Sequence, residues 1–527
     1  MAHAEPQPRR PGRASATAPR AGAGALVCGL ATALLSAVTT PVAAFDGPTT
    51  HAGLTGEAVL RSGLHQALRG LGLPLGLFTP LRLGHTALAA APAELTALRE
   101  ALARLDAAEG YRPGDDGVQS ALGWITAGSV LAGLPAQLER HHFFDPVAQR
   151  GLDQRHWGTS AAAAALATLE GGAPLRALLA GVGFDLSGMA APRWLRAPTN
   201  RLSVESFFVR LEGATRATSA AAREQHLVLA LLSLGGLLHV LQDMGSPTHV
   251  RNDFAPGMLE RLGDSPLDRG SAFERYVARR FGRVGLQALA DRAGRQTLVT
   301  RPSIGAFFSA GDWQGLADLT HARHFSPGTL PEGVAVGRDT TAAAVQQTLL
   351  RQLRYAAPAP PPLDLGCARE RVCYAHAPQG AWLAYRIDAR ARLQLWLDER
   401  CYAATARDTL PRVLRYTLGL IAHLLRGTVT LEPLTSGGVA ARHGGPALAR
   451  GTLRWLVEDR GGNRRLLAER ALDRARRQSG ALVDALSPQQ VTALGADPQA
   501  RRLLAQLLGR DRQGDPVLAV ASLPLHR

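Results

Sequence analysis

Apolar residues recur at helical spacing over most of the chain between residues 45 and 354. Apolar positions three and four residues apart share one face of a helix, so these runs predict amphipathic helices around a common core. We expect helices over residues 55–73, 93–105, 160–169, 221–244, 271–281 and 341–353. Pro92 precedes the second run and Gly110 follows it, at the positions where these residue types bound helices. This part of the chain is therefore expected to be mainly α.

The pattern changes after a proline-rich connector at residues 358–362. Residues 382–387 and 393–397 alternate between apolar and polar positions, which is the period of a half-buried strand. We therefore expect a small β-rich insertion at residues 363–404, within a helical domain that spans residues 45–426.

Residues 409–425 return to helical spacing, and Pro411 falls in the first turn of the expected helix, where a missing N–H is tolerated. Short alternating runs follow at residues 428–431, 452–457 and 517–523, with polar and helical stretches between them. We expect residues 427–527 to form a C-terminal accessory domain that is partly β. The predicted fold class is thus mainly α, with a small β insertion and a partly β C-terminal domain.

The first 44 residues have the order of a secretory signal peptide. Arginines precede an apolar run at residues 25–38, and small residues follow it up to Ala44. The run is short for a bilayer span. We expect residues 1–44 to be removed on export, which leaves Phe45 as the mature N-terminus of a periplasmic or secreted protein. No later run predicts a transmembrane segment.

Composition narrows the class of protein. With 46% hydrophobic and 19% charged residues, the chain is neither disordered nor fibrous. Its net charge is +16, and every basic residue other than histidine is arginine. A positive surface favours phosphate-bearing partners, either nucleic acid or an anionic membrane. The expected mature chain has three cysteines, Cys367, Cys373 and Cys401, so one disulfide could form and leave one thiol free.

The most specific chemical motif lies at the end of the longest predicted helix. His239 and Asp243 are four residues apart and share one helical face. Gly245-Ser-Pro247 ends the helix, so the chain can fold His249 back toward the same place. Two imidazoles and a carboxylate are donors well suited to zinc. The alternative is a buried histidine bonded to Asp243, with His249 on a surface loop.

Two further segments offer candidate ligands. His141 and His142 precede Phe-Phe-Asp-Pro, and because adjacent side chains point in different directions, at most one of them is expected to be a ligand. His51 lies six residues after Phe45, whose free amino group and carbonyl oxygen could chelate a metal once residue 45 is the N-terminus. Taken singly, each segment is equally compatible with a structural histidine.

In combination and in order, these segments resemble the bacterial zinc-dependent phospholipase C family and its relatives, the zinc single-strand nucleases. The family helix HxxxDxxxxxH is present as His239, Asp243 and His249, and its HFYDP segment appears as residues 142–146. The late glutamate of the family is matched by Glu274. The resemblance implies a nearly all-helical catalytic domain that holds up to three Zn²⁺ ions.

The resemblance also implies a ligand for each ion. His142, His239 and Asp243 would hold one zinc; His249 and Glu274 the second; Phe45, His51 and Asp243 the third, with Asp243 bridging. His142, Asp243 and Glu274 would be the catalytic residues. A zinc-bound hydroxide would then attack the headgroup phosphodiester of a phospholipid at a membrane surface.

Two positions depart from the family pattern. Gly133 stands where the family has an aspartate that binds metal and is a candidate general base, and Gly270 stands where it has a histidine. Substitutes close in sequence are His141, Asp145, Asp253 and Asp268. Water can fill a vacant ligand position, and zinc lowers the pKa of bound water to about 7.

Two alternatives to a phospholipase C-like hydrolase therefore stay open. A single-strand nuclease of the same superfamily would have nucleic acid as its partner, and a metal-depleted descendant would be a non-catalytic binding protein. The chain has no Gly-rich phosphate loop and no Gly-x-Ser-x-Gly motif, so we expect no nucleotide cofactor and no serine hydrolase.

Overall fold

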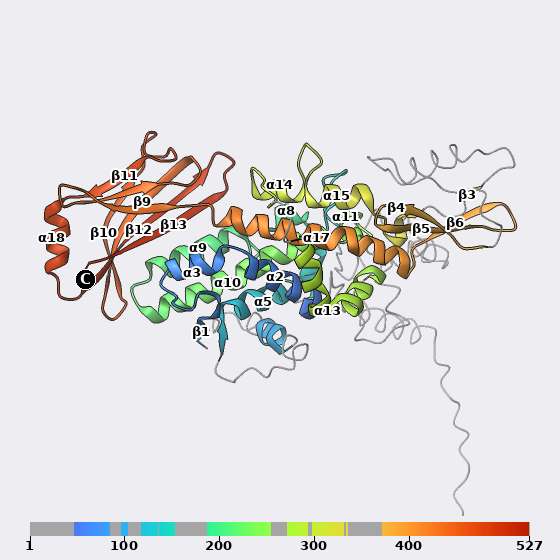
Figure 1. Cartoon of the computed structure of the whole chain (residues 1–527), viewed down its shortest axis with the longest axis horizontal. Helices are drawn as coiled ribbons and strands as arrows, with labels where there is room; N and C mark the ends of the chain where they lie inside the picture. Colours follow the sequence, from blue (N-terminus) through green and yellow to red (C-terminus); the bar gives the residue numbers. More distant parts are fainter. Residues whose placement is uncertain are drawn as a thin grey trace, which may run out of the picture. The chain divides into compact units, whose positions relative to one another are not determined.

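The computed structural model describes residues 47–84, 96–103, 117–134, 136–152, 187–253, 271–293, 298–330, 334–335 and 371–525. These residues form helices together with four small antiparallel sheets (Figure 1). Several sequence predictions concern residues outside these ranges: the signal peptide at 1–44, the helices at 160–169 and 341–353, and the connector at 358–362. The expected helix at 93–105 is helical over its described part, residues 96–103.

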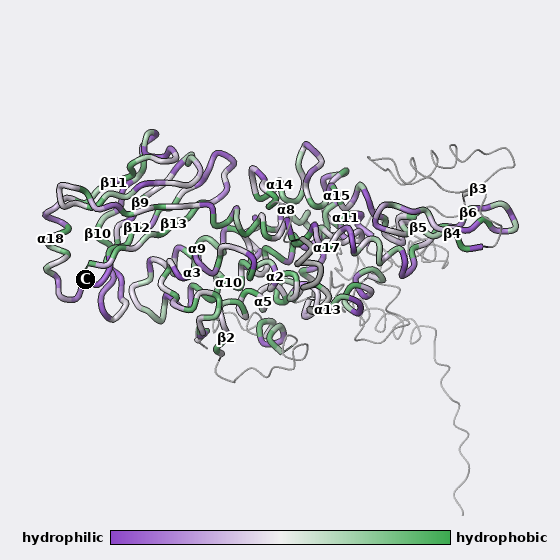
Figure 2. The backbone as a smooth tube through the Cα atoms, in the orientation of Figure 1, coloured by the Kyte–Doolittle hydropathy of each residue, from purple (hydrophilic) through white to green (hydrophobic). Residues whose placement is uncertain are grey.

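Two helices that pack backbone to backbone form the centre of the helical region. α5 (Ala121–Leu131) and α10 (Ala220–Asp243) begin at Ser120 and Ser219, whose side chains accept amide hydrogen bonds. A β-carbon at Gly128 would lie 2.1 Å from the carbonyl oxygen of Leu232 on the facing helix. The two helices can therefore approach this closely only because glycine stands at the crossing. Figure 2 shows much of both helices as hydrophobic.

α10 is also apolar enough by length and composition to cross a membrane. Its most apolar window has a mean hydropathy of 1.4, but 78% of that window is buried inside the protein. Packing against α5 and α9 (Val204–Arg216) accounts for this hydrophobicity. α10 matches the helix predicted over residues 221–244.

The remaining helices surround this pair. They are η1 (Gly47–His51), α2 (Ala52–Arg61), α3 (Leu64–Gly70), η2 (Gly76–Phe78), η4 (Ala136–His142), α8 (Ala191–Trp194), α11 (Pro247–Val250), α13 (Ala272–Ala293), α14 (Ile304–Phe308), α15 (Leu316–Arg323) and η6 (Pro327–Thr329). The single helix predicted over residues 55–73 is wrong, because Ser62 turns extended and bonds back to Val59, which separates α2 from α3. Short strands β1 (Pro80–Arg82) and β2 (Val118–Ser120) pair beside them.

α17 (Glu399–Leu424) begins ten residues before the predicted start at residue 409. The carboxylate of Asp398 accepts hydrogen bonds from the amides of Arg400 and Cys401, which fixes the helix start there. Pro411 is consequently inside the helix rather than in its first turn, so that prediction is wrong. A proline at this depth removes one helical hydrogen bond, a loss that packing of the buried face offsets.

The predicted β insertion contains β4 (Cys373–Ala377), β5 (Gly380–Ile387) and β6 (Arg392–Trp396). They pair in the order β3-β6-β5-β4, with β3 (Val334–Ala335) coming from outside the predicted range. Cys373 is disulfide-bonded, and Cys401 is a buried free thiol beneath the sheet. One disulfide and one free cysteine were expected from the sequence.

The C-terminal region holds more strand than the sequence indicated. Its strands are β7 (Val429–Pro433), β8 (Val439–His443), β9 (Leu448–Asp459), β10 (Arg464–Ala471), β11 (Leu482–Leu486), β12 (Ala500–Asp511) and β13 (Pro516–Pro524), and its one described helix is α18 (Pro488–Ala496). Two antiparallel sheets, β10-β9-β12-β13 and β11-β8-β7, share one hydrophobic core.

The helical stretches expected in this region are confirmed at α18, whereas β12 is a strand. Leu503, Leu504, Leu507 and Leu508 have the spacing of a helical face. In the structure this segment is a central strand between β9 and β13 and is buried on both faces. Because both faces are apolar, its sequence does not alternate between apolar and polar residues. Neighbouring strands, which local sequence cannot reveal, decide its conformation.

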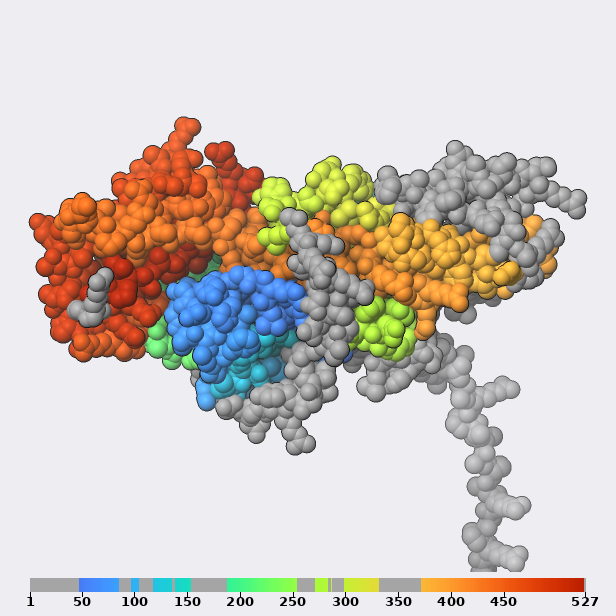
Figure 3. Space-filling view, in the orientation of Figure 1, coloured from blue at the N-terminus to red at the C-terminus, as the bar shows by residue number. Residues whose placement is uncertain are grey.

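A buried carboxylate joins the C-terminal sheets to the helical region. Asp515, between β12 and β13, accepts a hydrogen bond from the Ile304 amide at 2.7 Å and lies 3.0 Å from Nε2 of His423. Arg196 donates to its other oxygen. The surface of α3, in blue, also meets the C-terminal strands, in red (Figure 3). The helical region and the C-terminal sheets are thus held together by buried polar contacts as well as by the contact between α3 and the C-terminal strands.

Candidate metal centre

The site is built at the C-terminal end of α10. His239 and Asp243 are both buried and point from the same face, as their spacing predicts. The helix ends at Asp243, and in the turn that follows a β-carbon at Gly245 would lie 2.1 Å from a methyl group of Val413 on α17. The close approach of α17 therefore requires glycine at this turn. α11 then begins at Pro247 and brings His249 back beside the helix end.

Three imidazoles surround the carboxylate of Asp243. Nε2 of His51, on η1, lies 3.1 Å from Oδ1. Nδ1 of His142, on η4, and Nε2 of His239 lie 3.0 and 3.2 Å from Oδ2. All four side chains are almost completely buried. The sequence segments that carry them are far apart along the chain, and the fold brings them to one point.

The nitrogen atoms that face Asp243 are oriented by hydrogen bonds to the opposite side of each ring. Nδ1 of His51 lies 2.7 Å from the side-chain oxygen of Gln242, and Nδ1 of His239 lies 2.5 Å from the carbonyl oxygen of Ser129. Because an oxygen acceptor takes the Nδ1 proton, each Nε2 keeps its lone pair toward the carboxylate. This is the tautomer that a metal ligand needs.

A second pair lies next to this cluster. Nε2 of His249 is 3.6 Å from Oε1 of Glu274, on α13, and Nδ1 of His249 is 3.1 Å from the carbonyl oxygen of His142. Ser246 donates to Oε1 of Glu274, and the Ser271 amide donates to Oε2 at 2.8 Å. The carboxylate is thus fixed by two donors with one oxygen toward His249.

Several of these buried atoms make no hydrogen bond within the described part of the chain. They are Nδ1 of His142, Nε2 of His239, Nε2 of His249 and both carboxylate oxygens of Asp243. Buried polar atoms are nearly always hydrogen-bonded, and leaving one unpaired costs about 1–3 kcal/mol. A group of them facing one another is the arrangement that a bound cation satisfies.

Electrostatics keep the cluster in the protonation state of a ligand set. Burial lowers the pKa of His51, and the charge of His239 lowers it further. Burial likewise lowers the pKa of His142 and of His239. Burial alone would raise the pKa of Asp243, but the surrounding histidines outweigh it and hold that pKa well below its usual range. Near neutral pH the site therefore combines neutral imidazoles with an ionised carboxylate, as metal binding requires.

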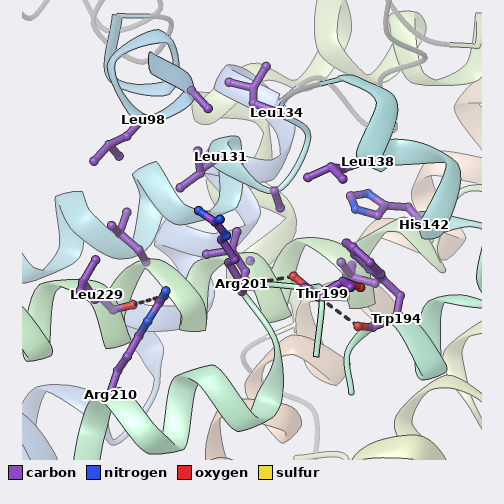
Figure 4. Close-up of a pocket in the computed structure, with 17 residues that line it drawn as sticks. Leu98, Leu131, Leu134, Leu138, His142, Trp194, Thr199, Arg201, Arg210 and Leu229 are labelled. Atoms are coloured by element: carbon purple, nitrogen blue, oxygen red, sulfur yellow. Dashed lines mark hydrogen bonds between the residues drawn. The ribbon is translucent and has the colours of Figure 1, made fainter. Parts of the chain in front are cut away.

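An apolar cavity of about 290 Å³ opens beside the cluster, and His142 forms part of its wall. Figure 4 shows His142 and Trp194 on one side of the cavity and Arg210 with Leu229 on the other. Its lining is mostly aliphatic and includes Leu98, Leu131, Leu134, Leu138, Leu232 and Val240. Arg210 donates to the carbonyl oxygen of Leu229 and to Ser233, and burial together with the charge of Arg201 lowers its pKa to about 10.

No protein-family model matches the chain, and no curated protein matches it. Among solved structures, it is similar to alpha toxin from Clostridium absonum, with a TM-score of 0.25 and 10% sequence identity over 91% of this chain and 99% of that chain. It is also similar to alpha-toxin from an avian strain of Clostridium perfringens, with a TM-score of 0.24 and 11% identity over the same shares. This similarity is distant and assigns no function.

The structure brings together six of the seven metal ligands expected from the sequence. His51, His142, His239 and Asp243 form one cluster, and His249 with Glu274 forms the adjoining pair. Phe45, the seventh, lies outside the described residues, as does Gly270. The sequence alternative in which His249 sits on a surface loop is wrong, because its side chain is fully buried.

Of the substitutes suggested for the ligands missing at Gly133 and Gly270, the three that the structure describes bond to groups outside the cluster. Both nitrogens of His141 are engaged, by the Met189 amide and by Arg140, and its ring stacks on Trp194. Asp145 accepts from the amides of Val147 and Ala148 in a turn.

The third described substitute, Asp253, is also bonded elsewhere. Asp253 accepts from the Gly328 amide at 2.7 Å, which ties it to the turn at η6. Asp268 is outside the described residues.

Sequence reasoning missed the residues that orient the ligands and one buried acid. Gln242 and Ser129 could not be recognised, because their roles depend on the packing of α10 against α2 and α5. The acid is Glu139, which is three residues before His142 on η4 and only 4% exposed. Residues three apart share a face of a 3₁₀ helix, so this spacing was a usable signal.

A second group of potential ligands, His423, Asp511 and Asp515, lies at the junction with the C-terminal sheets. Its acceptors are already bonded to protein donors: Asp515 as described above, and Asp511 by Arg426 at 2.8 Å and by the amides of Gln513 and Asp515. This group therefore serves as a structural contact.

Proposed function

We propose that this protein is an exported, zinc-dependent phosphodiesterase that resembles phospholipase C and hydrolyses the headgroup phosphodiester of phospholipids. The observation that supports this proposal is the ring of imidazole nitrogens and carboxylate oxygens around Asp243, which are buried and lie within about 3 Å of that carboxylate. The motif order in the sequence points to the same chemistry.

The donor set fits zinc. Neutral imidazole nitrogen and carboxylate oxygen are ligands that zinc prefers, and carbonyl or amide acceptors already orient two of the rings. His142, His239 and Asp243 would hold one ion, His51 and Asp243 would hold another together with Phe45, and His249 with Glu274 would hold a third. Bound zinc would supply charge neutralisation for the phosphate oxygens and a water with a pKa near 7.

The chain's own residues would position the substrate. The carboxylate of Asp243, fixed between His51 and His142, would be a ligand to the bound metal. The burial of Glu274 and His249 keeps bulk water away from that side. The aliphatic cavity beside His142 would accept an apolar part of the substrate, and Arg201 and Arg210 supply positive charge for an anionic group.

The cavity also favours a lipid over a nucleic acid. A nuclease of this class would present aromatic faces for bases to stack on. The cavity lining is mostly aliphatic, and Trp194 in its wall is 5% exposed with one face already stacked on His141. Single-stranded nucleic acid is therefore the control substrate.

The test uses the full chain after export and removal of the leader. Elemental analysis measures zinc per chain, and headgroup release from phosphatidylcholine vesicles is measured in parallel with nucleotide release from single-stranded DNA. Asp243→Asn is expected to lose both zinc and at least about a thousandfold of the hydrolysis, since it removes the bridging charge. His226→Asn, an exposed histidine on the same helix, is the matched control. Zinc-loaded protein that hydrolyses neither substrate would refute the proposal.

A further inference from the structure

Gly133 and Glu139 occupy complementary space beside the metal centre. A β-carbon built at Gly133 would stand 2.8 Å from Oε1 of Glu139 and 3.7 Å from Cε1 of His239. The carboxylate of Glu139 therefore fills the volume into which a side chain at position 133 would project. A side chain at position 133 would displace this carboxylate from its present position.

The position of Glu139 follows from the chain leading to His142. Both residues belong to η4, a 3₁₀ helix, and residues three apart on such a helix lie one above the other. His142 reaches Asp243 from this helix, so Glu139 is carried to the same side one turn earlier. Glu139 is 4% exposed, so its carboxylate lies inside the protein on the side of the metal centre.

We propose that Glu139 is a metal ligand of this centre, contributing a carboxylate oxygen to the ion held by His142, His239 and Asp243 in the place that Gly133 leaves open. The inference rests on the proposed function, because it assigns a ligand to that same site. The residue reaches the ion from a different backbone position, six residues further along the chain. Oxygen from a carboxylate is a normal zinc ligand beside two imidazoles.

The direct test removes the charge of Glu139 with little change in shape. Glu139→Gln is compared with the wild-type protein by zinc content and by competition with a chromophoric chelator. The wild type is also loaded with Co²⁺, whose visible absorption reports the ligand set. We expect one bound ion to be held at least about a hundredfold more weakly in the variant and the cobalt spectrum to change. Glu57→Gln, at an ion pair with Arg61 on α2, is the matched control and should alter neither.

A swap of positions provides a second, independent readout. Gly133→Asp alone should crowd Glu139 and weaken metal binding, whereas Gly133→Asp combined with Glu139→Ala should restore the zinc content that Glu139→Ala loses. Circular dichroism confirms that each variant is folded. Recovery in the double variant would show that one carboxylate at this point is what the ion requires.

The outcomes separate this inference from the proposed function. Wild-type protein that binds no zinc would overturn both. Wild-type protein that binds zinc, together with Glu139→Gln protein that binds it with the same affinity and the same cobalt spectrum, would overturn the role of Glu139 alone. The role of Glu139 alone would also be overturned if the double variant failed to recover zinc while Gly133→Asp alone retained it.

Discussion

His51 and His239 stack face to face at the candidate metal centre, with 3.6 Å between ring centroids and 18° between ring planes. Two imidazolium ions this close would repel each other strongly, and burial already disfavours each charged form. The pair is therefore held neutral, and each ring keeps a lone pair toward a different oxygen of Asp243. The side of the site at Oδ1, with His51, and the side at Oδ2, with His239, can therefore be tested separately.

Removal of one stacked ring should remove one ion. In His51→Ala protein, Oδ1 of Asp243 loses its imidazole neighbour while Oδ2 keeps His142 and His239. We expect the zinc content measured by elemental analysis to fall by about one ion per chain relative to wild type, and the remaining zinc to be retained through gel filtration. His226→Asn should keep the wild-type content. An unchanged content in His51→Ala protein would contradict this assignment.

The crossing of α5 and α10 should tolerate no side chain. A β-carbon at Gly235 would lie 2.0 Å from the carbonyl oxygen of Ile125. We expect Gly235→Ala to lower the free energy of unfolding by about 3 kcal/mol, because the backbones must separate. Urea unfolding followed by circular dichroism measures this change.

The matched control for that variant is Gly56→Ala on α2, where a β-carbon meets nothing within 4 Å. Gly56→Ala should instead raise the free energy of unfolding by about 0.5–1 kcal/mol, since alanine is the better helix former. If Gly235→Ala were as stable as Gly56→Ala, the crossing would not be as close as described.

His321 should contribute to instability in acid. Burial, and then the charge of Arg251, lowers the pKa of His321 to about 2. In the unfolded chain His321 binds a proton near pH 6.5, whereas in the folded chain it stays neutral at that pH. The contribution of neutral His321 to the free energy of unfolding is therefore complete above pH 6.5 and is lost as the pH falls. The loss is up to about 1.4 kcal/mol per pH unit.

The variant that tests this dependence is His321→Leu. We expect its free energy of unfolding to change less between pH 7 and pH 4 than that of the wild type, whatever its value at pH 7. His226→Asn, with an exposed histidine, should follow the wild-type dependence. Parallel curves for His321→Leu and wild type would contradict the prediction.

The cavity arginines should contribute to substrate binding rather than to the chemical step. Arg210 lies in the cavity wall, and Arg210→Met keeps its aliphatic part while removing the charge. We expect KM for vesicles that contain anionic lipid to rise about fivefold, which corresponds to about 1 kcal/mol per basic residue, with kcat unchanged. Arg216→Met, exposed near the end of the same helix, is the control and should have no effect. A fall in kcat at constant KM would contradict this role.

The sequence predicted those features that depend on short spacing. His239 and Asp243 could be placed on one face of a helix, and the turn after Asp243 could be expected to return His249, because these relationships span one or two helical turns. That His51 and His142 lie at the same point came only from a resemblance, since their meeting depends on how α2, α5 and α10 pack.

The errors have a local cause in one case and long-range packing as their cause in the others. Pro411 suggested a helix start, but the start is fixed by the Asp398 carboxylate upstream, which is a local signal that the proline obscured. The leucines of β12 have helical spacing and yet form a central strand, because two neighbouring strands bury both of its faces. Glu139 was overlooked because its relation to Gly133 exists only in three dimensions.

The glycines at the α5–α10 crossing have a consequence for how this protein can diverge. Main-chain atoms at Gly128 and Gly235 set the distance between the two helices, so the position of Ser129 relative to His239 does not depend on the size of the surrounding leucines. Those leucines can be exchanged for other aliphatic residues over evolutionary time while the histidines keep their places. Relatives of this chain should therefore be recognisable by two glycines and a few ligands long after overall sequence identity has disappeared.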